Sequence, residues 1–543
     1  MSGGMAAGSG HPGAHVVLTG QQEAWQQGGG PGKYWEDKPN AGYSGTPLWK
    51  LHAERAAALQ ADATSGAVKI PDGFVKQDGD WFWSEKRQVF WNIQDRKFYV
   101  WDIHAQTRSE LYEAKTYELG IAVGGMCHER ASQVRHVIVR DLAKAAQALR
   151  MSIEHLDRPC AMYALYEGHR GGSSGNACAD FCAKHLHGKL LPKLAAFRGY
   201  WEDSKLEATM RESFEELDAN FAERNPGATD GCSAAVALVL GCRLVVASLG
   251  DIACTLCLRS GETAKIVQAH AVPDPDAEDE ESEDEEDGGG PSAASTAAPK
   301  PPIRWTRAFG DLDFKGLGST PRLVATPDVK VLHLQHKHHG FAFISRKLYA
   351  SIGGGTAVST VFRRSAGRPR MASGALVDAA VQWLGQVEPD CGLASVVAFF
   401  DKIESPDDGP RAKRPRTETL QVRLRHILLK HRECKSTVDK VRNKQVKRTR
   451  GDAERLLRAV LEECDGDREQ KVFTQRCRDL SECQSCLKAG DLAGDLGWLK
   501  RGTSAATSAG KLGEAFEVSA FGLQVGQLSD LVDSDQGVHI ILR

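Results

Sequence analysis

The chain lacks any long apolar segment. No apolar run among its 543 residues approaches the roughly 18 to 20 residues that a membrane-spanning helix needs. The Gly-rich start also lacks the charged and apolar regions of a secretory signal peptide. No membrane partner is therefore expected, and the sequence predicts a cytosolic or nuclear protein.

Clustered cysteine is missing as well. The 14 Cys residues are scattered and follow no disulfide framework, which is typical of reduced thiols in a large intracellular protein. Two C-x-x-C pairs, Cys254 with Cys257 and Cys483 with Cys486, raise the question of zinc. The first pair falls in an expected strand, where positions three apart face opposite ways, and the second has no partner pair. The sequence therefore argues against a zinc site.

Charge of one sign does not dominate the whole chain, because 69 Lys and Arg nearly balance 71 Asp and Glu. An acidic block nevertheless begins the segment 274–302, where Asp and Glu surround Ser282 before Gly, Pro, Ser and Ala follow. Such a run repels itself and stays solvated, so it predicts a disordered insertion. Attraction of basic partners, or phosphorylation at Ser282, is the functional alternative.

A basic block occupies the linker 404–420, which contains the sequence PRAKRPR at 410–416. This cluster is typical of a nuclear localisation signal and predicts importin as a partner and a nuclear protein that also occurs in the cytoplasm. A plain charged linker is the alternative. No recognition fold for DNA or RNA accompanies the cluster, so nucleic acid is not an expected partner.

The N-terminal part divides into two segments. Residues 1–32 are rich in Gly, Ala, Ser and Gln and are expected to be disordered. Within 33–112, aromatic clusters recur about every eight residues between Trp81 and Asp102, which predicts a meander of very short strands. This pattern resembles the OCRE module of RNA-processing proteins and implies a protein ligand. The alternative is that the aromatic residues only fill the core of a small β domain.

Ordered motifs follow between residues 113 and 403. They are YALYEGHRGG at 163–172, DGCSA at 230–234, LVVASLGD at 244–251, and RAFGD at 307–311 followed by PDV at 327–329. In this order they resemble PPM-type (protein phosphatase 2C) Ser/Thr phosphatases. The resemblance implies two packed antiparallel sheets with flanking helices, and a site where carboxylates hold two Mg2+ or Mn2+ ions.

The carboxylates of that metal site are largely absent. The substituted ligand positions are Val134 with Arg135, Glu167 with Gly168, Arg346 with Lys347, and Cys391 with Gly392. A site that keeps one carboxylate and gains arginine cannot repay the dehydration of Mg2+. The sequence therefore predicts a pseudophosphatase that holds no metal cofactor and is used for docking. An active metal-dependent phosphatase joined to the C-terminal domain is the alternative.

Two roles fit the added arginines Arg135 and Arg346. A guanidinium pairs bidentately with phosphate, so the relic site is one candidate for binding a phosphoprotein without cleaving it. The alternative is that both arginines pair with Glu167 or other acids and only stabilise the fold.

Two histidine-bearing strands bracket the last segment, 421–543. The first contains VRLRHILLKH at 422–431 and the second GVHIILR at 537–543. Between them lie a helix that Asp452 is expected to cap, the tripeptide SEC at 481–483 and the turn GDLG at 494–497. This arrangement resembles the parvulin family of peptidyl-prolyl cis-trans isomerases and implies a small α+β domain.

The resemblance assigns the catalytic positions to His426, Cys483 and His539, and the proline-binding pocket to Leu496, Leu512 and Phe516. Rotation of an X–Pro bond must overcome partial double-bond character, but no bond breaks. An apolar cup with a few polar groups that favour a twisted amide therefore suffices. Structural packing of the two strand histidines is the alternative.

A basic loop follows the first strand and carries Lys430, Arg432 and Lys435. Phospho-specific parvulins have basic residues at this place, so the resemblance implies protein substrates with phosphate before proline. A solvated basic loop is the alternative. The chain as a whole is interpreted as a multidomain α+β protein, a nuclear isomerase with a docking phosphatase fold, against the alternative of a non-catalytic nuclear scaffold.

Overall fold

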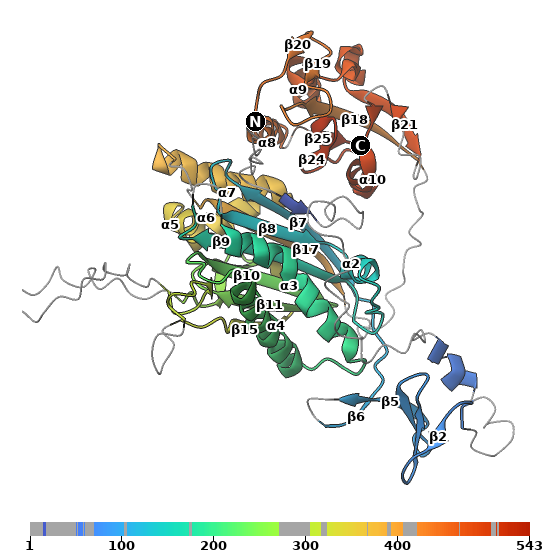
Figure 1. Cartoon of the computed structure of the whole chain (residues 1–543). Helices are drawn as coiled ribbons and strands as arrows, with labels where there is room; N and C mark the ends of the chain where they lie inside the picture. The colour runs from blue at the N-terminus through green and yellow to red at the C-terminus, as the bar shows by residue number, and fades with distance from the viewer. Residues whose placement is uncertain are drawn as a thin grey trace, which may run out of the picture.

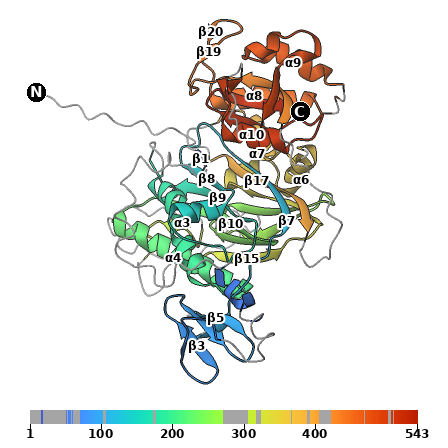
Figure 2. The same cartoon turned by 90° about the vertical axis from the view of Figure 1, so that its right-hand side faces the viewer.

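The computed structural model describes residues 15–17, 50–51, 53–57, 59, 70–102, 106–172, 176–270, 305–315, 323–365, 367–387, 392–404, 421–465, 467, 469–500, 506–507 and 510–543. The acidic insertion, the basic cluster and Cys391 lie outside these residues. A sandwich domain forms the middle of the molecule, with the aromatic module at one end and the C-terminal domain at the other (Figure 1). The quarter-turned view in Figure 2 shows the same order. No helix in the described ranges is long and apolar enough to cross a membrane.

The aromatic module is a five-stranded antiparallel meander, as its spacing predicts. Its strands, in spatial order, are β2 (Val75–Lys76), β3 (Trp81–Ser84), β4 (Val89–Asn92), β5 (Lys97–Asp102) and β6 (Thr107–Glu110). Because side chains alternate along a strand, Phe82, Trp91 and Phe98 are buried in a core shared with the sandwich domain. Trp81 and Tyr99 pack edge to face at 4.8 Å on the other side of the sheet.

Two antiparallel sheets make up the sandwich domain, which confirms the predicted architecture. The first has the order β1 (His15–Val17), β8 (Val134–Val139), β9 (Cys160–His169), β10 (Gly231–Leu240), β11 (Arg243–Leu249) and β15 (Asp328–His333), with β14 (Phe309–Gly310) beside β10. The second has the order β13 (Thr263–Val267), β12 (Ala253–Leu258), β16 (His338–Ile344), β17 (Ala394–Glu404) and β7 (Glu118–Cys127).

Alternate residues along the strands of the first sheet pack into two separate hydrophobic cores. Tyr163 and Leu165 of β9 face the second sheet, whereas Ala164 and Tyr166 pack with the helices on the outer face. Those helices are α2 (Leu142–Ala148), α3 (Ala177–Ala196) and α4 (Asp203–Arg224). The second sheet is accompanied by α5 (Arg346–Ser351), α6 (Gly355–Arg364) and α7 (Pro369–Leu384).

Strand β1 corrects one expectation. Residues 15–17 fall in the segment expected to be disordered, yet they pair in parallel with β8, His15 opposite His136. Backbone pairing with the edge of the sheet orders these three residues, although their composition does not favour order.

The C-terminal domain is built on a four-stranded sheet with the order β21 (Asp495–Lys500), β18 (Gln421–Leu429), β25 (Gly537–Leu542) and β24 (Val532–Ser534). Its helices are α8 (Arg450–Glu463), α9 (Lys471–Leu480) and α10 (Gly513–Gly522). Short elements complete it: β19 (Val438–Asp439), β20 (Lys444–Gln445), η3 (Gln484–Leu487), η4 (Gly490–Leu492), β22 (Ala506–Thr507) and β23 (Gly510–Lys511).

The start of α8 differs from the prediction. Thr449 is the N-cap, and Asp452 is the third helical residue, whose carboxylate returns to the Thr449 backbone. The two side chains thus form a capping box that satisfies two backbone N–H groups at once. Asp452 therefore stabilises the helix end from within the first turn, and the helix begins earlier than predicted, after Thr449.

Candidate functional site

Two buried histidines form the centre of the C-terminal domain. In the antiparallel pairing of β18 with β25, Leu428 lies opposite His539 and His426 lies opposite Ile541. The diagonal offset brings the two imidazoles together, with 3.0 Å between their Nδ1 atoms and 5.2 Å between ring centroids. Both side chains are fully buried. The sheet register therefore creates the pair that the sequence predicted.

Ser534 extends the pair into a chain of hydrogen bonds. Its Oγ lies 2.7 Å from His539 Nε2 and donates to the carbonyl of Gly537 at 3.3 Å. Two arrangements of the ring hydrogens satisfy these contacts, because Ser534 Oγ can donate to His539 Nε2 or accept from it. In either arrangement His426 Nε2 is buried and has no hydrogen-bond partner among the described residues.

Burial keeps the pair uncharged. It lowers the pKa of His426 to about 3, and burial together with the neighbouring His426 lowers the pKa of His539 well below its usual value. A dry environment disfavours the imidazolium, and a second imidazole beside it adds repulsion. The site consequently offers neutral hydrogen-bonding groups near pH 7, not a general acid.

An apolar cluster lies against the pair. Phe516 of α10 is fully buried and points its edge toward both imidazoles, with centroid distances of 6.2 Å to His426 and 5.1 Å to His539. Leu512 belongs to the same cluster, and Leu496 packs against it. The three residues predicted to cradle proline are thus brought together next to the histidines.

The tripeptide at 481–483 is fastened along β18. The Glu482 N–H donates to the Leu428 carbonyl at 2.9 Å, and the Leu428 N–H donates to Ser481 Oγ at 3.2 Å. Cys483 is buried, and its Sγ accepts a hydrogen bond from Ser485 Oγ at 3.2 Å. Within the described part of the chain, no hydrogen bond joins this thiol to the histidine pair.

In the sandwich domain, two of the predicted metal positions, Glu167 and Arg346, lie together and make a hydrogen bond and an ion pair with groups of the chain. The Arg346 N–H donates to Glu167 Oε2 at 3.0 Å, and the Arg346 guanidinium lies 3.2 Å from Asp251 Oδ2. Burial and the nearby Asp251 carboxylate raise the pKa of Glu167 to about 8. Of these positions Glu167 is the one that keeps a carboxylate, and the Arg346 N–H occupies one of its oxygens.

Arg135 turns away from this region. Val134 pairs with Glu167 across β8 and β9, and strand alternation sends the next side chain to the opposite face. There Arg135 lies 2.6 Å from Asp180 of α3 and donates to the Ser132 carbonyl. Both added arginines thus pair with acids of the chain, although only Arg346 reaches Glu167.

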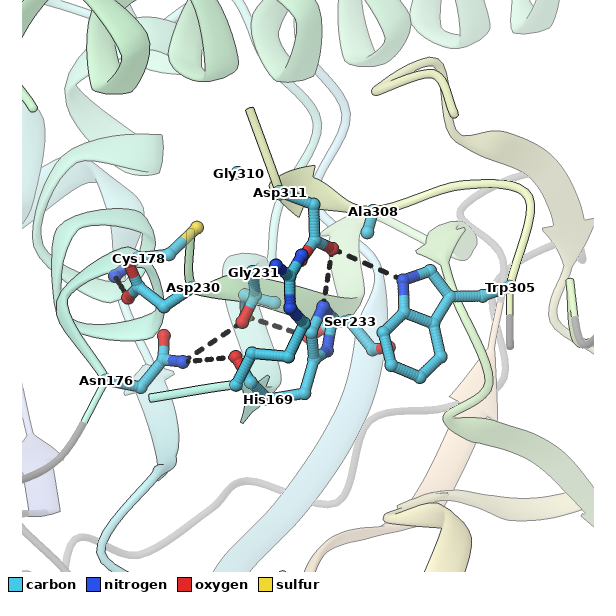
Figure 3. Close-up of polar contacts among 12 residues, drawn as sticks. His169, Asn176, Cys178, Asp230, Gly231, Ser233, Trp305, Ala308, Gly310 and Asp311 are labelled. Atoms are coloured by element: carbon cyan, nitrogen blue, oxygen red, sulfur yellow. Dashed lines mark hydrogen bonds and ion pairs between the residues drawn. The ribbon is translucent and has the colours of Figure 1, made fainter. Parts of the chain in front are cut away.

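The motif EGHRGG supplies a second closed cluster, drawn in Figure 3. Asp311 is fully buried and accepts from His169 Nε2 at 2.6 Å, from Trp305 Nε1 at 3.3 Å and from Arg170 at 2.9 Å. Arg170 is further held by Asp313 at 2.6 Å. Across the described ranges, no three His, Cys, Asp or Glu side chains are arranged to hold a metal ion.

Comparisons with known proteins agree with the geometry of the C-terminal domain. A model of the PPIC-type PPIase domain matches residues 426–543. The peptidyl-prolyl cis-trans isomerase ESS1 of Saccharomyces cerevisiae is 32% identical over 131 residues, which cover 24% of this chain and 69% of that protein. Pin1 of Digitalis lanata is 35% identical over 126 residues, covering 23% of this chain and 95% of Pin1. The chain belongs to the PPIC-type isomerase family.

The sandwich domain has its own relatives. A model of protein phosphatase 2C matches residues 139–383, so this part is a PP2C domain. Protein phosphatase 1K of Xenopus laevis is 28% identical over 205 residues, which cover 36% of this chain. The match spans only half, 50%, of that relative's length.

The basic loop of the PPIC-type domain divides its three candidate residues. Lys430 is buried, and its Nζ donates to the Val438 carbonyl at 2.6 Å, so it closes the loop from inside. Arg432 and Lys435 are exposed, with a Glu433 carboxylate 3.9 Å from Arg432 and Asp535 bound to Lys435. Of the three residues, only Arg432 and Lys435 are exposed to solvent.

Sequence reasoning on the PPIC-type domain missed Ser534 and Val532. Ser534 bonds His539, and Val532 lies opposite His539 in the β24–β25 pairing and joins the pocket cluster. The hairpin of β24 and β25 could have indicated both residues, because Ser534 pairs with Gly537 across a two-residue turn of Asp535 and Gln536.

Proposed function

We propose that the chain is a peptidyl-prolyl cis-trans isomerase whose PP2C domain does not hydrolyse phosphate esters and serves for docking. One observation carries the proposal: the neutral pair His426 and His539 lies against Phe516 in an apolar cluster. The names of the ESS1 and Pin1 relatives support this activity.

The chemistry asks little more than this arrangement. The X–Pro amide resists rotation by about 18 to 20 kcal/mol because of its resonance. Phe516 and the Leu residues around it hold the proline ring away from water, where the amide loses polar stabilisation. His426 Nε2 and the thiol of Cys483 are the polar groups available for hydrogen bonds that favour a twisted amide.

The proposed substrates are proline-containing protein segments, with preference for phosphorylated Ser or Thr before proline. Exposed Arg432 and Lys435 carry this preference, since a guanidinium and an ammonium pair strongly with phosphate. Lys430 is excluded from the phosphate-binding set because its Nζ is occupied inside the loop.

Absence of phosphatase activity is proposed from the ion pairs of the PP2C domain. Mg2+ needs several ionised oxygen ligands, whereas Glu167 has a raised pKa and Asp251 is already paired with Arg346. The residues present do not fit the two metal ions of the family.

Paired assays of the full chain test both halves of the proposal. NMR exchange spectroscopy should show accelerated cis-trans exchange of a Ser-Pro peptide and its phosphorylated form. The same preparation with millimolar Mn2+ should release no phosphate from a phosphopeptide and show no rise in Tm. Phosphate release that disappears in Glu167→Ala would establish an active phosphatase, and unchanged peptide exchange would remove the isomerase assignment.

We further propose nuclear import through the basic linker, with importin recognising residues 410–416. A tagged chain that lacks residues 411–416 should move to the cytoplasm. A nuclear signal that survives the deletion would exclude the linker from this role.

A further inference from the structure

The PP2C domain and the isomerase domain share one helix end. Helix α7 of the PP2C domain starts after Arg368, which forms no side-chain cap. The carboxylate of Asp530, from the isomerase domain, accepts the backbone N–H groups of Arg370 at 2.6 Å and Met371 at 3.1 Å. Because the first N–H groups of a helix have no partner inside it, Asp530 replaces the missing cap.

Arg370 adds a second link between the domains. Its guanidinium donates to the Leu531 carbonyl at 3.1 Å and to Glu454 of α8 at 2.5 Å. Burial alone lowers the pKa of Arg370, but Glu454, Asp533 and Asp530 together raise it above its usual value. The guanidinium therefore stays charged inside the interface, where removal of one partner is costly.

Apolar and ionic contacts extend the interface along α7. Met371 is buried within the hydrophobic cluster of the isomerase domain. About two turns further along α7, Asp378 lies 2.6 Å from Arg458 of α8. Between them Gly374 faces Arg458 so closely that a Cβ would lie 2.6 Å from its guanidinium.

The segment that receives these contacts also serves the isomerase site. Asp530 and Leu531 lead directly into β24, whose Asp533 lies 3.8 Å from Arg370. Side chains alternate along a strand, so Val532 and Ser534 face the other way. Val532 joins the pocket cluster with Phe516, and Ser534 bonds His539.

We infer that the PP2C domain is part of the isomerase architecture, with Arg370 as a positioning residue that fixes β24 and thereby Ser534 and Val532. The inference rests on the proposed isomerase function. Arg370 touches no substrate; its guanidinium holds the Leu531 carbonyl and lies 3.8 Å from Asp533, so that the backbone of β24 keeps its register against β25. Loosening this anchor should widen the ensemble of His539 and Ser534 geometries and lower turnover.

Three variants of the full chain test the inference. Arg370→Ala removes the guanidinium, and Arg370→Lys keeps one charge that reaches only part of the acceptor set. Gly374→Leu raises helix propensity and displaces the Arg458 guanidinium from Asp378, which loosens the ionic contact between the domains without weakening α7. Ala379→Leu, at an exposed position of the same helix, is the matched control.

The expected result is a split between kinetic constants. Arg370→Ala and Gly374→Leu should lower kcat by about fivefold or more while KM changes little, because the basic loop and pocket still bind peptide. Arg370→Lys should recover part of kcat, and Ala379→Leu should equal wild type. In the chain labelled with 15N-histidine, the His539 imidazole signals should shift in Arg370→Ala and Gly374→Leu but not in the control.

Two results separate the failure of this inference from that of the proposed function. A wild-type chain that does not accelerate exchange removes the isomerase activity itself, while the imidazole shifts still report whether the domains are coupled. Active wild type with unchanged kcat and unchanged His539 signals in folded Arg370→Ala and Gly374→Leu would overturn the inference alone.

Discussion

The histidine pair of the isomerase domain and the arginines of the PP2C domain satisfy their polar groups in opposite ways. In the isomerase domain, His426 and His539 are buried without charge, and His426 Nε2 has no hydrogen-bond partner among the described residues. In the PP2C domain, Arg346 and Arg170 are each neutralised by acids, Asp251 and Asp311. Pairing inside the chain reduces the capacity of these arginines for other partners, whereas His426 Nε2 keeps its capacity.

The largest expected effect breaks the isomerase side of this comparison. Phe516→Ala removes the ring that lies against both histidines and opens a cavity in the pocket cluster. We expect kcat/KM for cis-trans exchange to fall about 100-fold, together with roughly 3 to 5 kcal/mol of stability.

Phe516→Leu is the control that separates the loss of kcat/KM from the loss of stability, because it restores most of the apolar volume but not the aromatic ring. NMR exchange and urea unfolding of the full chain measure both quantities. Wild-type exchange rates in Phe516→Ala would show that the cluster around Phe516 is core alone and not the proline pocket.

Most of the isomerase site follows from sequence because it depends on strand register. His426 and His539 lie on neighbouring strands, and Phe516 lies on α10, which precedes the closing strand. Lys430 was predicted to contact phosphate because it follows the strand in a basic loop. The structure buries it, since the loop folds back and Val438 offers a carbonyl for its Nζ.

The contact between the domains has no local signal in the sequence. Arg370 and Asp530 are separated by 160 positions, and each looks like an ordinary surface charge. Arg368 at the start of α7 is a weak hint, because it provides no cap of its own. Thr449 could have been recognised, since Thr followed three residues later by Asp matches the capping-box pattern.

A pH series sharpens the comparison by a moderate effect. The folded pKa values of His426 and His539 lie below the unfolded value of about 6.5, so the unfolded state binds more protons as pH falls. Their stability contribution is complete above about pH 6.5 and is lost below it, by up to about 1.4 kcal/mol per pH unit for each histidine.

Urea unfolding and peptide exchange, each measured from about pH 7.5 to about pH 5.5, check this expectation. Stability should decline below about pH 6.5, while kcat of the folded chain stays flat because the pair remains neutral. The variant Ser534→Ala, which removes a partner of His539 but no titratable group, should follow the same pH slope. A kcat that falls around pH 6.5 at constant stability would mean that the pair titrates in the native state.

The smallest effect concerns substrate preference. Arg432 and Lys435 are exposed on the basic loop, and their present partners, Glu433 and Asp535, are exposed acids that phosphate can displace. Exposed ion pairs contribute little, about 1 kcal/mol or less, so their loss should not disturb the fold. The double variant Arg432→Ala/Lys435→Ala should therefore reduce the ratio of kcat/KM for phospho-Ser-Pro over Ser-Pro peptide by roughly five- to tenfold and leave Ser-Pro exchange unchanged.

Lys444→Ala/Lys447→Ala, which removes two other exposed positive charges from the same region, is the matched control for net charge. The preference should also weaken with added salt in wild type and less so in the double variant, because screening acts on these charges. Equal losses in both double variants would assign the preference to the general field of the loop, and an unchanged ratio would remove phosphate from the specificity of this isomerase.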